Sequence, residues 1–215
     1  MTTSAIGIVG HVDRADAAHQ LMDNVAAAFL SLDNGNFGCH GNHRRVWRHL
    51  SERFGQHVDW LVVLEDDAIP CPDFTHQLNQ ALSVSLNPIV SLYLGKLRPT
   101  HLQYMIEPAL KRADDNDANL LISRHVLHAV GLAIQSPRVP ELLAEVTEDL
   151  PIDEAIGAWA MRRRFRVAYT NPSLINHADG DTLLKHPDNQ GREPGRVAWR
   201  FGTRDTWTYE TVEMQ

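Results

Sequence analysis

Cysteine and long hydrophobic runs are both scarce in this chain of 215 residues. Its two cysteines, Cys39 and Cys71, are too few for a disulfide framework, which favours a reducing, cytoplasmic compartment. No apolar run approaches the roughly 20 residues that span a bilayer. The first four residues carry neither the basic region nor the hydrophobic stretch of a secretory signal peptide. We therefore expect a cytoplasmic protein without a membrane span.

Basic residues are also fewer than acidic ones. The formal net charge is −7, which argues against a general nucleic-acid binder, because such proteins usually carry a basic surface. The basic residues are nevertheless unevenly placed, at Arg162, Arg163, Arg164 and Arg166, and again at Lys185, Arg192, Arg196, Arg200 and Arg204. They form either a local basic face or an ordinary solvated helix face followed by a polar tail.

Internal repeats, low-complexity tracts and domain boundaries are absent from the sequence. Its length is sufficient for one α/β domain with a substantial core. We predict a single domain over residues 1–215. Residues 180–215 form a polar tail that carries Trp199, Phe201 and Trp207, and these aromatic residues predict that the tail packs on the body.

Apolar runs and helical periodicities alternate along the chain. Strands are predicted at residues 5–10, 29–32, 60–64, 89–94, 128–135 and 165–169. Helices are predicted at residues 15–29, 39–54, 73–86, 139–146 and 153–164. Residues 98–118 are polar and give no clear prediction. The alternation indicates an α/β protein with a central sheet flanked by helices, in which ligands bind beyond the carboxyl ends of the strands.

An acidic triplet, Glu65-Asp66-Asp67, follows the continuous apolar run of residues 60–64. Adjacent carboxylates at the end of a buried strand repel one another, and a bound divalent cation removes that cost. Side chains alternate along a strand, so Glu65 and Asp67 are predicted to point to one side and Asp66 to the other. Oxygen ligands favour magnesium or manganese, which would neutralise a diphosphate leaving group. The alternative is an ordinary acidic turn after a strand.

Several motifs around the triplet occur together in a known family. Gly38-Cys39, His43 and Trp47 precede a Leu-Glu-Asp-Asp-Ala run at residues 64–68, and this combination resembles family 25 glycosyltransferases and their lipooligosaccharide-type relatives. The strong similarity covers about residues 38–74, and a weaker one covers residues 151–177. An asparagine stands before His43 where the family carries serine. The resemblance implies a GT-A-like, Rossmann-related fold with a mixed sheet, a nucleotide-sugar donor, usually a UDP-sugar, and a manganese or magnesium ion.

The alternation along the strand suggests which residues bind the cation and the donor. Glu65 and Asp67, on one side, would hold the cation directly or through water, and Asp66, on the other, would bind a ribose hydroxyl or a backbone donor. A late histidine that completes the metal shell in GT-A enzymes corresponds to His177, with Asp179 or Asp181 as substitutes. The alternative for His177 is a surface histidine after a turn.

Two acids begin the helix predicted at residues 153–164. Inverting sugar transfer needs a carboxylate base that takes the proton of the acceptor hydroxyl, and similar enzymes place an acid near this point. Asp153 is the first candidate and Glu154 the second. The alternative is that both acids only complement the helix macrodipole, an effect of about 0.3–1 kcal/mol.

The ends of other predicted strands supply further donor-site candidates. His11, Asp13 and Arg14 follow the first strand, in the loop that embraces the nucleotide in GT-A folds, with Arg14 facing phosphate and Asp13 facing the uracil or ribose. Asp33 is another candidate for the base or ribose, and Lys96 is a candidate for the diphosphate or the acceptor. The loop lacks the Gly-x-Gly-x-x-Gly spacing of a dinucleotide-binding enzyme.

Cys39, His40 and His43 also suggest a zinc site. Only Cys39 and His43 share a helix face, and the sequence offers no second cluster that would complete four tetrahedral ligands. The family resemblance instead makes His43 and Trp47 packing residues or donor-site residues.

The sequence leaves several functions open. The first is metal-dependent transfer of a sugar from a nucleotide sugar to a saccharide hydroxyl. The second uses a hydroxymethylated or otherwise modified DNA base as acceptor, since residues 91–95 and the arginine-bearing tail resemble small glycosyltransferases of actinobacterial phages. That resemblance would place the protein in a phage-infected bacterial cell. The third is a catalytically silent nucleotide-sugar-binding module, and the fourth is a metal-dependent nucleotide hydrolase.

Overall fold

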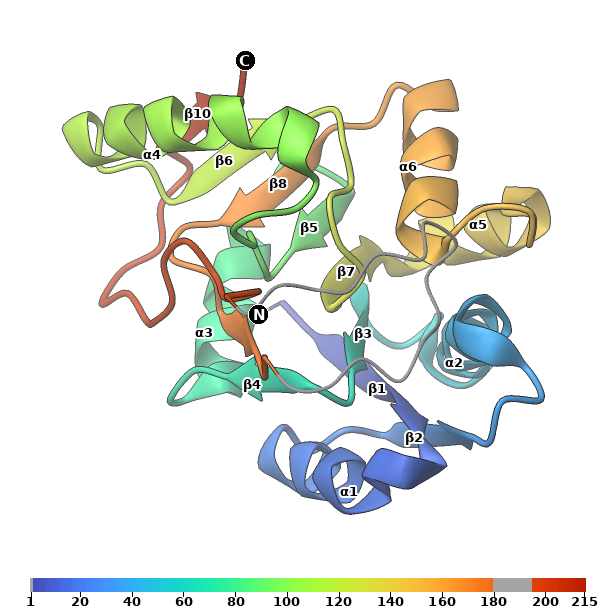
Figure 1. Cartoon of the computed structure of the whole chain (residues 1–215). Coiled ribbons are helices and arrows are strands. Elements are labelled where there is room, and N and C mark those ends of the chain that lie inside the picture. Colours follow the sequence, from blue (N-terminus) through green and yellow to red (C-terminus); the bar gives the residue numbers. More distant parts are fainter. Residues whose placement is uncertain (1, 180–194) are drawn as a thin grey trace.

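A mixed sheet of eight strands forms the centre of the protein (Figure 1). The computed structural model describes residues 2–179 and 195–215. In spatial order the strands are β10 (Thr211–Glu213), β6 (Leu120–Ser123), β8 (Val167–Thr170), β5 (Ile89–Ser91), β7 (Gly131–Gln135), β3 (Trp60–Glu65), β1 (Ser4–His11) and β2 (Phe29–Asp33). The predicted α/β class, with helices flanking a mixed central sheet, is confirmed.

Several of these strands run in one direction. β1 pairs in parallel with β2 and β3, and β5 pairs in parallel with β8. β7 lies antiparallel between β3 and β5, so β3 and β5 also run the same way. The carboxyl ends of β1, β2, β3, β5 and β8 therefore share one edge of the sheet, which is where α/β proteins bind their ligands.

Helices cover both faces of the sheet. α1 (Ala15–Asn24) and α3 (Phe74–Ser83) pack on one face, and α2 (Gly38–Phe54), α4 (Ile106–Asp115), α5 (Val139–Glu145) and α6 (Ile152–Arg162) pack on the other. Short 3₁₀ turns lie at Val12–Arg14, Thr100–Met105 and Ser136–Arg138. The side chains of β3 require helices on both faces of the sheet. Leu61 and Val63 face one helical layer and Val62 and Leu64 face the other, so the whole run is buried.

A separate two-stranded ribbon joins distant parts of the chain. β4 (Ala68–Pro70) follows the acidic triplet directly and pairs antiparallel with β9 (Ile175–His177). Ala68 lies opposite His177 in this register. The backbone N–H of Ala178 donates a hydrogen bond to the carbonyl of Asp67 at 2.8 Å. The ribbon thereby holds the turn after β3 against the segment that follows β8.

Most predicted elements agree with the structure, although their ends differ. The helix predicted at residues 15–29 ends at Asn24, and the strand predicted at residues 89–94 ends as β5 at Ser91. The strand predicted at residues 128–135 begins as β7 at Gly131. The sequence patterns do not predict α4, β4, β6, β9 or β10. These four strands have only three or four residues each, which is too short for an alternating pattern to show.

Residues 195–215 lie against the rest of the protein. Ala198 forms a β-bridge with Gly95, and β10 extends the sheet beside β6. The ring of Trp207 is buried, and its N–H donates a hydrogen bond to the side-chain oxygen of Gln77 at 2.8 Å. Three charged residues singled out in the tail lie outside the described residues, namely Asp181, Lys185 and Arg192.

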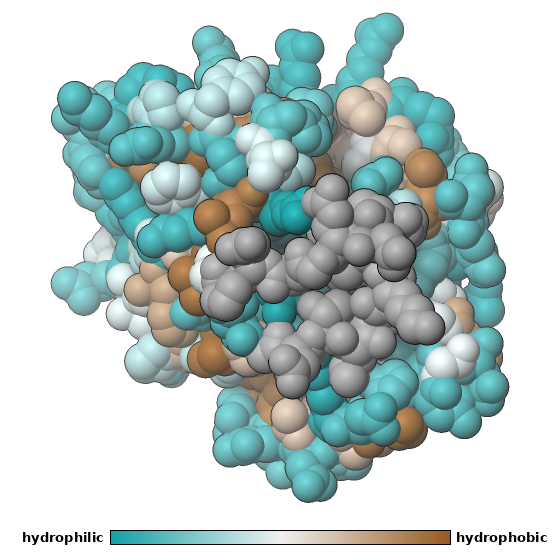
Figure 2. Space-filling view, viewed as in Figure 1, coloured by the Kyte–Doolittle hydropathy of each residue, from teal (hydrophilic) through white to brown (hydrophobic). Residues whose placement is uncertain are grey.

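None of the helices within residues 2–179 and 195–215 combines the length and the hydrophobicity of a membrane-spanning helix. The face of the molecule seen in Figure 2 is mainly hydrophilic, with hydrophobic residues scattered over it. Scattered apolar residues of this kind are normal on a protein surface.

Gly7 in β1 marks a close approach between the sheet and α2. A Cβ atom at this position would lie 2.5 Å from Cγ1 of Val46 and 3.1 Å from Cδ1 of Leu50, and both side chains are buried. We expect Gly7→Ala to lower the free energy of unfolding by about 1–3 kcal/mol, because overpacking forces side chains out of their preferred rotamers. Chemical denaturation measures this change.

Gly157→Ala is the matched control for that substitution. Gly157 lies inside α6, and an added Cβ atom would approach Val126 no closer than 3.7 Å. The free energy of unfolding should rise by about 0.4–1 kcal/mol, since alanine favours the helix and restricts the unfolded chain. An unchanged or increased free energy of unfolding in Gly7→Ala would contradict the close approach at Gly7.

Candidate active site

Charged side chains gather at the sheet edge where β1, β2 and β3 end. His11 at the end of β1 lies beside Asp33 at the end of β2. Glu65 ends β3 next to Val9 of β1. The sequence segments that were expected to contact a donor therefore meet at one edge of the sheet.

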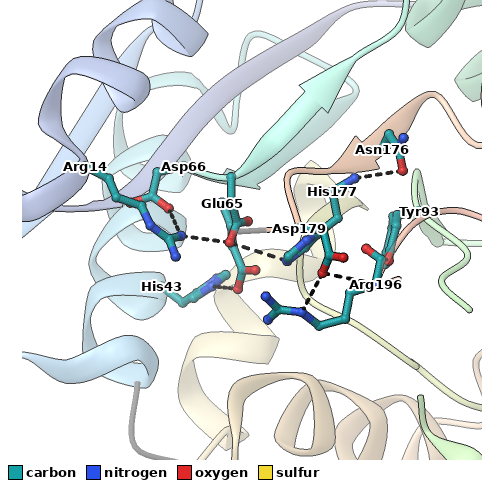
Figure 3. Close-up of polar contacts among 10 residues, drawn as sticks. Arg14, His43, Glu65, Asp66, Tyr93, Asn176, His177, Asp179 and Arg196 are labelled. Carbon is teal, nitrogen blue, oxygen red and sulfur yellow. Dashed lines mark hydrogen bonds and ion pairs between the residues drawn. The ribbon is translucent and has the colours of Figure 1, made fainter. Parts of the chain in front are cut away.

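Arg14 joins two members of the acidic triplet (Figure 3). Its Nη1 atom lies 3.0 Å from Oδ1 of Asp66 and 2.8 Å from Oδ2 of Asp67. Asp66 also accepts a hydrogen bond from the backbone N–H of His11 at 2.8 Å. The alternation predicted for the triplet does not extend to Asp67, because β3 ends at Glu65 and a turn follows. Asp66 and Asp67 consequently share one guanidinium group.

His177 lies next to Asp67, although the two residues are far apart in the sequence. Its Nε2 atom lies 3.4 Å from Oδ2 of Asp67, a distance that the β4–β9 ribbon sets. Oδ1 of Asp67 and Nδ1 of His177 are buried and have no hydrogen-bond partner among the described residues. Buried polar atoms without partners are rare in proteins, so the pair offers ligand atoms that the protein itself does not use.

The electrostatics of Asp67 favour a bound cation. Burial raises the pKa of the Asp67 carboxyl, and the neighbouring charge of Glu65 raises it further, whereas His177 acts in the opposite direction. A divalent cation would compensate for both the burial and the repulsion.

Glu65 forms an ion pair with His43. Oε1 of Glu65 lies 3.0 Å from Nε2 of His43, whose side chain is only 1% exposed. Burial acts to lower the pKa of His43, but hydrogen bonds to Cys39 and Glu65 outweigh it and raise the pKa to about 10. Burial acts to raise the pKa of Glu65, and the hydrogen bond to His43 outweighs that effect, so the pKa of Glu65 is lowered. The pair is therefore ionised at neutral pH.

Asp153 begins α6 and carries a carboxyl group with an unusual pKa. Burial raises the pKa of Asp153 to about 6, against a hydrogen bond from the backbone N–H of Glu154, and the charge of Glu65 adds to the rise. Glu154 itself is exposed. A carboxyl group that titrates near neutral pH is suited to accept a proton, and of the two acids Asp153 has this environment, whereas the role of either as a base stays a prediction.

The other predicted donor-site residues, Asp33, Asp13 and Lys96, each contact a different group. Both carboxylate oxygens of Asp33 accept backbone N–H groups at the start of α2, from residue 37 at 3.1 Å and from residue 38 at 2.9 Å. Asp13 is exposed, with Oδ2 at 3.4 Å from Nδ1 of His11. The Nζ atom of Lys96 lies 5.6 Å from the centre of the Trp199 ring. Their contacts with a nucleotide stay predictions.

Tyr93 and His128 belong to the same region but were not predicted from the sequence. The ring centre of Tyr93 lies 6.1 Å from that of His177 and 5.0 Å from that of His128. Tyr93 was not recognised as a site residue, because the strand predicted at residues 89–94 included it, whereas β5 ends at Ser91. An aromatic residue just beyond a strand end was the available signal.

Most of the described arginines that could form a basic face are paired with acids. Arg162 and Arg163 both contact Glu145, Arg163 also contacts Glu141, Arg166 contacts Glu213, Arg196 contacts Asp179, Arg200 contacts Asp114 and Arg204 contacts Asp117. These carboxylates neutralise the positive charge. The structure thus favours the simpler interpretation of these arginines as solvated, ion-paired surface residues.

Comparison with known proteins identifies relatives of the fold. No family model and no curated protein matches the sequence. The chain shares its fold with A197 from STIV. That similarity has a TM-score of 0.50 at 12% identity and covers 97% of each chain. A glycosyltransferase involved in the glycosylation of the major capsid of PBCV-1 matches with a TM-score of 0.46 at 10% identity, over 83% of this chain and 94% of its own.

Similarity at these identities concerns the arrangement of strands and helices, so the chemistry has to be argued from the side chains. Asp67 and His177 offer oxygen and nitrogen ligands at the carboxyl ends of the strands. Arg14 places a positive charge beside them. Asp153 contributes a potential base. Asp67, His177 and Arg14 are suited to hold a cation and an anionic ligand side by side, and the charge of Glu65 acts on Asp153.

Proposed function

We propose that the protein is a metal-dependent glycosyltransferase of the GT-A type, which moves a sugar from a nucleotide-diphosphate sugar to a saccharide hydroxyl. The observation that carries the proposal is the Asp67–His177 pair, with Nε2 of His177 at 3.4 Å from Oδ2 of Asp67. The pair lies where an α/β sheet binds ligands. The resemblance of residues 38–74 to family 25 glycosyltransferases supports the same activity, with a UDP-sugar as the preferred donor.

A manganese or magnesium ion fits the side chains at this position. The unpartnered Oδ1 of Asp67 and the imidazole of His177 would be its protein ligands. Glu65, the third ligand predicted from the sequence, groups instead with Cys39 and His43 among the described residues. When bound, the ion would stabilise the negative charge of the diphosphate leaving group.

Arg14 would bind the diphosphate beside that cation. Its guanidinium group contacts Asp66 and Asp67 and is only partly exposed. A planar guanidinium is well matched to phosphate oxygens. The resemblance to GT-A enzymes gives the loop of residues 11–14 the same role. We therefore assign phosphate contact to Arg14 and positioning of that loop to Asp66, which accepts the backbone N–H of His11.

Asp153 would act as the base of an inverting transfer. It would accept the proton of the acceptor hydroxyl as that oxygen attacks the anomeric carbon. Its raised pKa, caused mainly by burial, supports this role.

A saccharide acceptor is favoured over a modified DNA base. DNA binding depends on cationic side chains that neutralise phosphates, and affinity falls steeply with salt when they do. The arginines of residues 162–166 and 196–204 that could supply this charge are largely paired with acids. Salt-independent, weak retention on duplex DNA is the expected result for the purified protein.

A thermal-shift screen of nucleotide sugars, with and without manganese, tests the proposed function. A ligand at a hundred times its dissociation constant stabilises the native state by about 2.7 kcal/mol, which corresponds to a rise in Tm of about 5–10 °C for a chain of this size. We expect such a rise for at least one UDP-sugar, and only with the metal present. The proposal fails if no nucleotide sugar shifts the Tm in manganese.

Product analysis on the stabilising donor separates the remaining alternatives. Transfer to a saccharide panel supports the proposal. Binding without any turnover would indicate a catalytically silent module, and release of free sugar that acceptors do not accelerate would indicate a hydrolase.

A further inference from the structure

Cys39, His43 and Glu65 form a cluster of three different ligand types. One ligand atom from each residue, a sulfur, a ring nitrogen and a carboxylate oxygen, lies within 4.8 Å of the other two. Cys39 is a free thiol of intermediate exposure. The sequence offered the cysteine and the histidine but no further ligand near them. The end of β3 supplies the third one.

The helix α2 fixes two of the three side chains. Cys39 and His43 are four residues apart, so they lie on the same face of a helix of 17 residues. His40 is not part of the cluster, because its Nδ1 atom lies 2.9 Å from the backbone carbonyl of Leu150. His43 is buried and its Nε2 atom already lies 3.0 Å from Glu65. Little reorganisation is needed to bring the three ligands to one point.

The spacing of these atoms is close to that of a tetrahedral metal site. Bonds of about 2.0–2.3 Å place the ligand atoms of tetrahedral zinc about 3.3–3.8 Å apart, so the widest pair has to close by only about 1 Å. Rotation of the partly exposed Cys39 and Glu65 side chains can provide that movement.

We propose that Cys39, His43 and Glu65 bind one zinc ion, with the fourth coordination position open to water or another ligand. A thiolate and an imidazole select zinc and other thiophilic cations, whereas magnesium and manganese prefer oxygen ligands. Only the neutral imidazole of His43 can bind a metal, so zinc has to displace the proton that this ring carries at neutral pH. Three protein ligands and one open position are the arrangement of catalytic rather than closed structural zinc sites.

This zinc site does not rest on the proposed sugar transfer. It uses the thiol of Cys39, which that reaction does not need. A test based on the spectrum of the bound metal can therefore fail while the transferase proposal stands, and the reverse is also possible.

Titration of the metal-free protein with cobalt(II) tests the site directly. Cobalt bound to a thiolate gives a charge-transfer absorption in the near ultraviolet, and tetrahedral cobalt gives intense visible bands. We expect both features to saturate at one equivalent of cobalt per chain, and one equivalent of zinc to abolish them.

Two cysteine variants provide a matched comparison. Cys39→Ser should remove the charge-transfer band, whereas Cys71→Ser should retain it, because Cys71 is buried elsewhere beside β4. Glu65→Gln should weaken zinc binding by about 10-fold or more. Asp67→Asn should retain the cobalt–thiolate band, which separates this site from the Asp67–His177 pair. Circular dichroism verifies that each variant is folded.

Three results would overturn the proposal. The first is a wild-type protein that shows no cobalt–thiolate band at one equivalent. The second is a band that persists in Cys39→Ser, and the third is a band that disappears in Cys71→Ser instead.

Discussion

Asp67→Asn is expected to remove manganese-dependent binding of the nucleotide sugar and to lower kcat/KM by about 100-fold or more. A catalytic metal ion contributes several kcal/mol of charge stabilisation, and each 1.36 kcal/mol changes the rate by about tenfold. Asparagine keeps the shape of the side chain but loses the charge that a cation needs. One oxygen of Asp67, Oδ1, is buried and has no partner among the described residues, and the other, Oδ2, lies 3.4 Å from Nε2 of His177.

Thermal shift with and without manganese, followed by steady-state kinetics, measures both effects of Asp67→Asn. Asp23→Asn is the control, because Asp23 is an exposed residue of α1. The control should behave as the wild type does. Retention of metal-dependent binding and turnover in Asp67→Asn would show that the acidic triplet does not hold the metal.

Asp153→Asn is expected to lower kcat by about 100- to 10,000-fold, which is the usual contribution of general base catalysis. Donor binding should survive, because Asp153 belongs to α6 rather than to the triplet. In the wild type, the carboxyl group accepts a proton only when it is ionised. Its pKa of about 6 therefore predicts that kcat falls as the pH drops through that value.

Kinetics of Asp153→Asn at several pH values, together with donor binding measured by thermal shift, provide the test. The acidic limb of the pH profile should vanish with the carboxyl group. Glu154→Gln tests the second candidate and should have a much smaller effect, because Glu154 is exposed. A product that retains the configuration of the donor, or an unchanged kcat in Asp153→Asn, would rule out Asp153 as the base.

The sequence was most informative where one element alone determines the structure. The apolar run of residues 60–64 is long enough to identify β3, and its abrupt end locates the acidic triplet. The direction of Asp66 and Asp67 could not be predicted, because it depends on where the strand stops and on the position of Arg14. Three-residue strands such as β4 and β9 carry no periodic signal, so the ribbon between them was also unpredictable.

Contacts between residues that are far apart in the sequence could not be predicted, because they depend on how helices and strands pack. His43 and Glu65 come from α2 and β3, and their ion pair depends on how that helix packs on the sheet. The raised pKa of Asp153 depends on burial and on the charge of Glu65, and the neighbouring sequence predicts neither of them. Local patterns thus suggested which residues carry chemistry, while packing decided which of them act together.

The β4–β9 ribbon joins two segments that the ribosome adds at different times. Asp67 is added to the chain long before its partner His177. A nascent chain on the ribosome therefore presents the triplet long before the histidine has been added. The proposed binding of metal and nucleotide should therefore appear only after His177 has been added and the ribbon has formed.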